Sequence, residues 1–249
     1  MIAVVTGSGR CGTHSVARFL GQQRHPDGRP VTVQHETEWH EIVTDLLNRR
    51  EDGVNARLRG FGHDVEVSPF LLLMSEPPDW TGQPGAPLIG VVRDGRDTIR
   101  SGMSHGWYWN PQAHVLGWPE LLPRFDGDRF EQCCQYWSWT CGRLLKWQAT
   151  VVTLERLAGD PRERMRLLSR LQIAGAGGDF PCENQTCYEA PDRIEHMTVL
   201  ADQSDWPGPF PPAREWSAAQ RAAFGRYCGD YMDRFYPAWE ERADDPLAP

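Results

Sequence analysis

The stretch Ile2–Leu20, IAVVTGSGRCGTHSVARFL, has the pattern of a buried strand, a glycine-rich turn and the first turns of a helix. Three glycines in the turn allow positive φ angles and a close approach of the backbone to a ligand: Gly7, Gly9 and Gly12. Val16, Phe19 and Leu20 then recur at the spacing that places one face of a helix on a sheet. Such a loop directs backbone N–H groups and the positive end of a helix dipole at one point. The stretch therefore predicts an α/β fold with an anion site, for phosphate.

The order of residues in this loop differs from the nucleotide triphosphate loop GxxxxGK[ST]. Gly12 is followed by Thr13 and His14, with no Lys, and the basic residue comes earlier, at Arg10. The order basic–small–Gly–Thr resembles the 5′-phosphosulfate loop of sulfotransferases that use 3′-phosphoadenosine 5′-phosphosulfate (PAPS), with His14 in place of the second Thr. Thr13 and Ser15 are also suited to cap the helix. The resemblance implies that these loop residues bind the nucleotide: Gly9, Arg10, Cys11, Gly12, Thr13, His14 and Ser15.

A second stretch, Leu88–Ser101, again has the pattern of strand, turn and helix. It resembles the 3′-phosphate motif of the same family, a strand followed by RDPRD and a later Ser, although Gly95 stands where Pro is usual. The resemblance implies that Arg93 supplies a forked guanidinium and Ser101 a hydroxyl to the 3′-phosphate. The alternative is a solvated run of charges at a helix start. Two phosphate-competent units in the family's order favour the sulfotransferase interpretation.

The residues after the expected second strand, Val31–Gln34, are candidates for a general base. His35 and Glu36 would lie at the C-terminal edge of the sheet, where open α/β folds bind ligands, on a strand expected beside the one that carries the loop. Related bacterial and Golgi-type enzymes place a carboxylate here, so Glu36 is the first choice. His35, with an ordinary pKa of about 6.5, and His105 stay open as alternatives. Neighbouring strand residues face opposite ways, so only one of His35 and Glu36 is expected to face the loop.

Arg10 is in the position of the family's loop Lys, and the resemblance implies that it stabilises the negative charge that grows on the departing phosphate. A further match lies at Glu66, Ser68 and Pro69, which fit a segment often written EKSPxY. Val67 stands where many relatives have Lys. Any role of that Lys is therefore absent here or taken by another residue.

The remaining pattern predicts several elements. A helix is expected over Glu38–Arg50 with Leu47 facing inward, followed by a connector over Arg57–His63. A later strand is expected within Thr150–Leu157, and Ser217 is a good N-cap for a last helix that ends at Phe235.

Residues 1–240 are expected to form one domain, with a tail over residues 241–249. Two segments, residues 102–125 and 174–212, are expected to form a lid or the acceptor side, because the first is rich in aromatic residues without helical periodicity and the second is rich in loops. Tryptophans around Trp107 are candidates to stack on adenine or on an aromatic acceptor, or to be core residues.

Composition excludes several classes of function. The net charge of −8, with no run of Lys or Arg, argues against nucleic acid as a partner. A strand at the second residue and no apolar stretch of membrane-spanning length predict a cytoplasmic protein without a membrane segment. Seven scattered cysteines without CxxC pairs favour neither a disulfide framework nor a zinc site, and no metal is expected. Homo-oligomerisation is left open.

Together, these residues are identified as those of a PAPS-dependent sulfotransferase that sulfates a hydroxyl group of a small-molecule acceptor. The resemblance implies a three-layer α/β sandwich, with a central, mainly parallel sheet and helices on both faces, related to P-loop nucleotide kinases. Two alternatives stay open: a P-loop-type kinase or phosphotransferase, which would need the missing loop Lys, and a non-catalytic nucleotide-binding protein.

Overall fold

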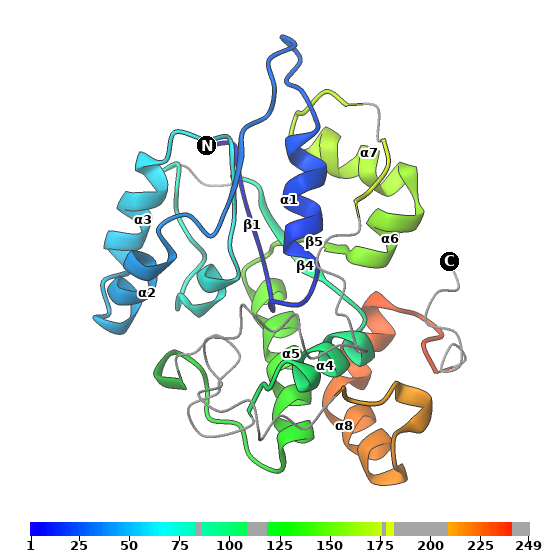
Figure 1. Cartoon of the computed structure of the whole chain (residues 1–249). Coiled ribbons are helices and arrows are strands. Elements are labelled where there is room, and N and C mark those ends of the chain that lie inside the picture. Colours follow the sequence, from blue (N-terminus) through cyan, green and yellow to red (C-terminus); the bar gives the residue numbers. More distant parts are fainter. Residues whose placement is uncertain (83–85, 109–118, 176–177, 182–208, 241–249) are drawn as a thin grey trace. The chain divides into compact units, whose positions relative to one another are not determined.

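The computed structural model describes residues 1–82, 86–108, 119–175, 178–181 and 209–240 (Figure 1). The chain forms two compact units. The sheet unit comprises residues 1–92 and 142–184, and the helical unit comprises residues 93–141 and 185–249. The expectation of one domain over residues 1–240 stays a prediction.

The sheet unit is built on five strands, all of whose pairings are parallel, in the order β2-β3-β1-β4-β5. The strands are β1 (Ala3–Gly7), β2 (Val33–His35), β3 (Val65–Val67), β4 (Leu88–Val92) and β5 (Thr150–Thr153). β1, β3 and β4 are buried along their whole length, as expected for interior parallel strands, and valine is frequent in them. This confirms the predicted parallel sheet.

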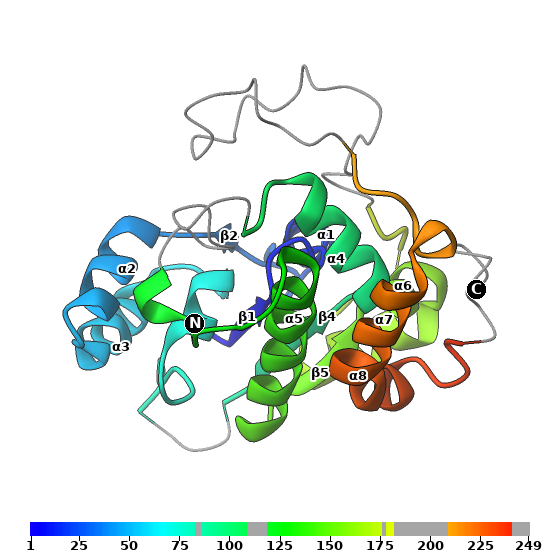
Figure 2. The ribbon, with the colours of Figure 1, turned by 90° about the horizontal axis from the view of Figure 1, so that it is seen from below.

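Helices pack on both faces of this sheet, so the predicted layered α/β fold is confirmed. The helical elements of the sheet unit are α1 (Thr13–Gly21), α2 (Trp39–Leu47), α3 (Glu51–Gly60), η1 (Pro69–Leu73), α6 (Leu154–Gly159) and α7 (Pro161–Arg170). One face of the sheet is covered by α1 and α7 (Figures 1 and 2). These helices bury Phe19 and Leu168 in one cluster with Val5 and its neighbours. The other face receives Leu144 from the last turns of α5 (Arg129–Lys146), which packs directly on Gly90. A fully buried Leu or Phe contributes about 1.5–3 kcal/mol.

Several element boundaries differ from the sequence expectations. α2 ends at Leu47, whose side chain is exposed rather than inward, and α3 takes in the residues up to Gly60 that were expected as a connector. α3 is difficult to recognise because it is strongly charged and buries only Val54 and Leu58. β2 begins at Val33 instead of Val31, because the Val31 N–H bonds to Gln23 O, away from the sheet.

The strand expected within Thr150–Leu157 is β5, and the chain turns into helix α6 at Leu154. The final helix, α8 (Ala218–Phe235), agrees with the prediction. The Ser217 hydroxyl accepts a bond from Gln220 N at 3.1 Å, and the Gln220 side chain bonds back to Ser217 N, which completes a capping box.

The helical unit holds α4 (Gly95–Ser104), η2 (Pro119–Leu121), the first part of α5, η5 (Ala213–Glu215) and α8. Its aromatic side chains pack edge to face, for example Phe130 against Trp216 with ring centroids 4.9 Å apart. Residues 109–118 and 182–208 of the expected lid segments, and the expected tail 241–249, lie outside the described residues.

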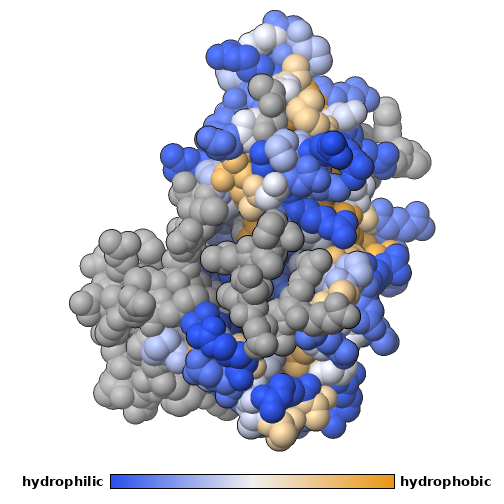
Figure 3. All heavy atoms as spheres, turned by 90° about the vertical axis from the view of Figure 1, so that its right-hand side faces the viewer, coloured by the Kyte–Doolittle hydropathy of each residue, from blue (hydrophilic) through white to orange (hydrophobic). Residues whose placement is uncertain are grey.

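No helix within the described ranges is both long and apolar enough to cross a membrane. The same residues contain no group of three or more His, Cys, Asp or Glu side chains placed to hold a metal ion. On the face drawn in Figure 3, the hydrophobic residues form small patches between hydrophilic ones. Among the residues that the structure describes, the large hydrophobic side chains that are exposed are those of Leu47 and Met165.

Candidate functional site

The loop between β1 and α1 has a strongly bent backbone. Its φ angles are 70° at Gly9, 52° at Arg10 and 90° at Gly12, all in the left-handed region. Gly7 has no room for a side chain, because a Cβ would lie 2.5 Å from Cys11 Sγ and 2.6 Å from Val91 O. The missing side chain at Gly7 therefore leaves room for Cys11 and for the Val91 carbonyl of β4.

The N-terminus of α1 has no side-chain cap. Its N-cap residue is Gly12, whereas the sequence suggested Thr13 or Ser15, and that expectation is wrong. Both residues lie inside the first turn of the helix and are buried. The first turn also contains no acidic residue. The positive end of the helix dipole is therefore not offset by a carboxylate of its own first turn, which favours an anion here.

His35, the last residue of β2, lies beside this helix start. His35 Nε2 is 3.3 Å from Thr13 Oγ1, and the His35 ring lies against the His14 ring at a tilt of 32°, with centroids 3.9 Å apart. Burial, followed by the nearby His14, lowers the pKa of His35 to about 4. His35 is therefore a neutral imidazole at neutral pH.

Glu36 lies one residue beyond the strand, in a left-handed conformation with a φ of 59°. Its Oε1 is 3.7 Å from His35 Nδ1, and a third of its side chain is exposed. Burial, followed by the charge of Glu66, raises the pKa of Glu36 above its ordinary value. Of the two residues, His35 contacts the start of α1, whereas Glu36 has left the strand and lies beside His35. The expectation that only one of them faces the loop stays a prediction.

The path from β2 to the loop also differs from the expectation. β3 lies between β2 and β1, so β2 is not adjacent to the strand that carries the loop. His35 reaches Thr13 because α1 packs against β2.

Glu66 matched a family segment in the sequence but received no role there. The structure places its side chain in β3 with no exposed surface. One feature of the sequence could have indicated a special role for Glu66. It is a single carboxylate between two valines, in a strand whose neighbouring residues predict burial on both faces.

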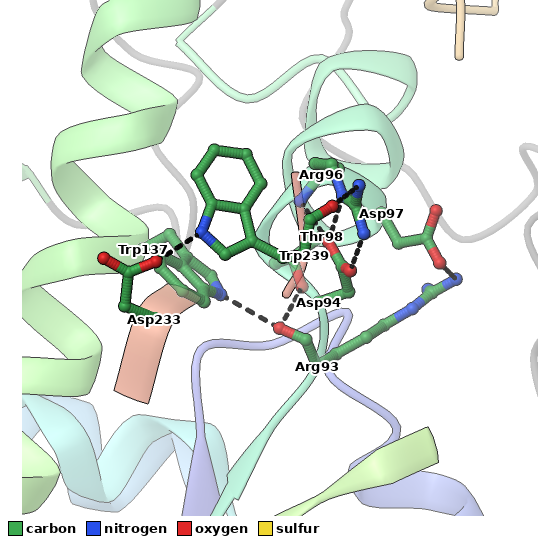
Figure 4. A network of polar contacts seen from close by, with 8 residues as sticks. All are labelled: Arg93, Asp94, Arg96, Asp97, Thr98, Trp137, Asp233 and Trp239. Atoms are coloured by element: carbon green, nitrogen blue, oxygen red, sulfur yellow. Dashed lines mark hydrogen bonds and ion pairs between the residues drawn. The ribbon is translucent and has the colours of Figure 1, made fainter. Parts of the chain in front are cut away.

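In the helical unit, the RDGRD motif forms the start of α4 (Figure 4). The Asp94 carboxylate caps the helix by accepting a bond from Arg96 N at 2.8 Å, and the Arg96 guanidinium binds it at 2.6 Å. Arg96 also donates to Trp239 O at 3.0 Å. Arg96 therefore has a structural role, because it ties α4 to the segment after α8.

Arg93 makes different contacts from those of Arg96. Its guanidinium lies 3.4 Å from Asp97 Oδ2, while its carbonyl oxygen accepts a bond from Trp137 Nε1 at 3.1 Å (Figure 4). Ser101, on α4, is fully buried, and His105 Nδ1 lies 2.8 Å from the Ser101 carbonyl oxygen. The roles of Arg93 and Ser101 toward a 3′-phosphate stay predictions.

Trp107, which the sequence offered for stacking or for the core, is a core residue of the helical unit. It is buried, contacts Tyr136 edge to face with centroids 5.4 Å apart, and fills the space that a side chain on Gly102 would need.

No protein-family model matches the chain, and no curated protein matches it. A solved structure that is similar to this chain is that of mouse sulfotransferase SULT7A1 complexed with PAP. The likeness covers 98% of this chain and 82% of that chain, with 15% sequence identity and a TM-score of 0.42. The assignment of a function therefore rests on the residues of the site.

Proposed function

We propose that this protein transfers a sulfuryl group from PAPS to a hydroxyl group of a small-molecule acceptor. One observation carries the proposal: the start of α1, with Thr13, lies 3.3 Å from His35, and His35 lies 3.7 Å from Glu36. The start of α1, which favours an anion, and the Glu36 carboxylate, which can accept a proton, thus lie near each other within the sheet unit. Transfer from a phosphosulfate to a hydroxyl needs both at one place.

The loop fits the phosphate end of such a nucleotide. Three left-handed residues bend its backbone, a glycine caps α1, and the first helical turn carries no acid that would repel an anion. In the proposal, the residues from Gly9 to Ser15 hold the 5′-phosphosulfate. Arg93 and Ser101 hold the 3′-phosphate. The bound nucleotide supplies the sulfuryl group and leaves as 3′,5′-bisphosphoadenosine (PAP).

Glu36 takes the proton of the acceptor hydroxyl as its oxygen attacks sulfur. A raised pKa makes the Glu36 carboxylate a stronger base than an ordinary one, and its partly exposed side chain can meet an acceptor from solvent. His35 orients this region through Thr13 and is the second candidate for the base. Arg10 stabilises the negative charge that develops on the departing phosphate, together with the dipole of α1.

Two measurements test the proposal. In the presence of a chelator, PAP should raise the melting temperature more than AMP, since a ligand at about 100 times its Kd stabilises a folded protein by about 2.7 kcal/mol. Incubation with PAPS and a panel of alcohols and phenols should then give a sulfated product, detected by mass spectrometry. Glu41→Gln, at an exposed position of α2, is the matched control for Glu36→Gln. The absence of both PAP stabilisation and any product would overturn the proposal.

A further inference from the structure

Glu66 is a buried carboxylate with two partners. Its side chain has no exposed surface, Oε1 accepts a bond from Thr37 N at 3.0 Å, and Oε2 lies 2.8 Å from His63 Nε2. The His63 side chain is itself only 10% exposed. A buried charge is costly, and a well-packed apolar residue in its place is often neutral or stabilising. The need for a carboxylate in this core strand is therefore not explained by stability alone.

The partners of Glu66 link it to the segment that carries Glu36. Glu36 and Glu38 both have left-handed backbones, with φ angles of 59° and 49°, and this conformation is unfavourable for residues other than glycine. Two hydrogen bonds to β3 hold the segment in place. The Glu36 N–H bonds to Val67 O at 2.9 Å, and the Thr37 N–H bonds to the Glu66 carboxylate.

The charge of Glu66 also acts on Glu36. His35 faces Glu36 from the end of β2, and His14 faces His35 from α1. His63, in the loop before β3, faces Glu66. β1 and η1 contribute no titratable side chain, since their sequences are AVVTG and PFLLL. Among these groups, Glu66 is the one whose negative charge opposes ionisation of Glu36.

We propose that Glu66 is a positioning residue for Glu36, the base of the proposed function: its carboxylate fixes the Glu36 backbone through the Thr37 N–H and so places a negative charge beside the residue that follows Glu36. The description of Glu36 as a base rests on the proposed function. The effect of Glu66 on the ionisation of Glu36 does not rest on it, because that effect can be measured without turnover.

The test is a carboxyl-carbon NMR titration of the protein labelled with ¹³C-glutamate, with the Glu36 signal assigned from its loss in Glu36→Gln. Glu66→Gln keeps an acceptor for Thr37 N but removes the charge. It should lower the midpoint of the Glu36 titration. The control Glu41→Gln should leave that midpoint unchanged. The acidic limb of kcat/KM should move to lower pH by the same amount. An unchanged Glu36 midpoint in Glu66→Gln would overturn the electrostatic part of the proposal.

The anchoring is tested on the unsubstituted protein, so that it does not depend on the folding of a variant. The Thr37 amide proton should exchange slowly with solvent, as a hydrogen-bonded amide does. Exchange at the rate of an unprotected amide would overturn the anchoring. A shifted Glu36 midpoint without any sulfated product would contradict the proposed function and leave the link between Glu66 and Glu36 intact.

Discussion

His35 Nε2 lies 3.3 Å from Thr13 Oγ1, and this contact joins the end of β2 to the first residue of α1. The two strands concerned, β2 and β1, are separated in the sheet by β3. The contact is possible because His35 points to the face on which α1 packs. It brings His35, and with it the adjoining Glu36, beside the start of α1 although β2 and β1 are not neighbours in the sheet.

The first prediction concerns the backbone of the loop. Gly12 and Gly28 have nearly the same φ, 90° and 88°, but a Cβ on Gly12 would overlap Leu154, whereas a Cβ on Gly28 meets nothing within 4 Å. Gly28→Ala should therefore cost only the strain of a left-handed alanine, about 1–2 kcal/mol. Gly12→Ala should cost a further 1–3 kcal/mol or so from overpacking, and should weaken PAP binding. Urea unfolding measures the loss of stability in the two variants, and equal losses would show that Leu154 does not constrain the loop.

A second prediction concerns nucleotide selectivity. Arg93→Ala should reduce the preference for PAP over AMP by about ten- to a hundredfold, because a charge-assisted hydrogen bond contributes about 1.5–3 kcal/mol. Calorimetry with both nucleotides measures the preference. Arg214→Ala, at an exposed arginine of the same unit, is the control. If the two variants retain the same preference for PAP, Arg93 does not contact the 3′-phosphate.

His35 should make stability depend on pH. Its pKa is about 4 in the folded protein, against about 6.5 in an unfolded chain, so between these values the unfolded state binds more protons. The contribution to stability is therefore fully present above about pH 6.5 and is lost as the pH falls toward 4. From about pH 7.5 to about pH 5, the loss should reach up to about 2 kcal/mol, measured by urea unfolding. His35→Asn should flatten this slope. An equal slope in both proteins would place the titration elsewhere.

The sequence predicted the parts of the molecule that depend on neighbours along the chain. The glycine-rich loop, the strand before Arg93 and the Ser217 cap follow from local propensity and spacing. What the sequence could not supply depends on packing between distant segments. The left-handed turn at Glu36 is held by β3, and the meeting of His35 with Thr13 depends on how α1 lies on the sheet. Neither the turn at Glu36 nor the contact between His35 and Thr13 produces a periodic pattern in the sequence.

The role of Arg10 can be separated from simple binding. Charge on the departing phosphate grows only as the reaction proceeds, so Arg10→Ala should lower kcat by about 10²-fold or more. The affinity for PAP should fall less, by about tenfold or below. Arg18→Ala, at an exposed position of α1, serves as the control. A loss of PAP affinity as large as the loss of kcat would make Arg10 a binding residue alone.

The last prediction concerns the base itself. Glu36→Gln keeps the shape and the hydrogen bonding of Glu36 but removes its basicity, so the rate should fall by about 10²–10⁴-fold while PAP binding stays intact. His35→Asn should have a much smaller effect, because the low pKa of His35 makes it the weaker base of the two. The acceptor should be an aliphatic alcohol. An acidic phenol arrives largely ionised, so it would hide the loss of a base.

The pH dependence of the same reaction gives a second measure of Glu36. As the solution is acidified, kcat/KM should fall when Glu36 becomes protonated. Because the pKa of Glu36 is raised, this fall should begin at a higher pH than it would with an ordinary carboxylate. Glu36→Gln should lose this limb of the profile. The opposite ranking of the two variants would assign the base to His35. Two mild effects would instead direct the search to His105, whose Nδ1 lies 2.8 Å from Ser101 O on α4.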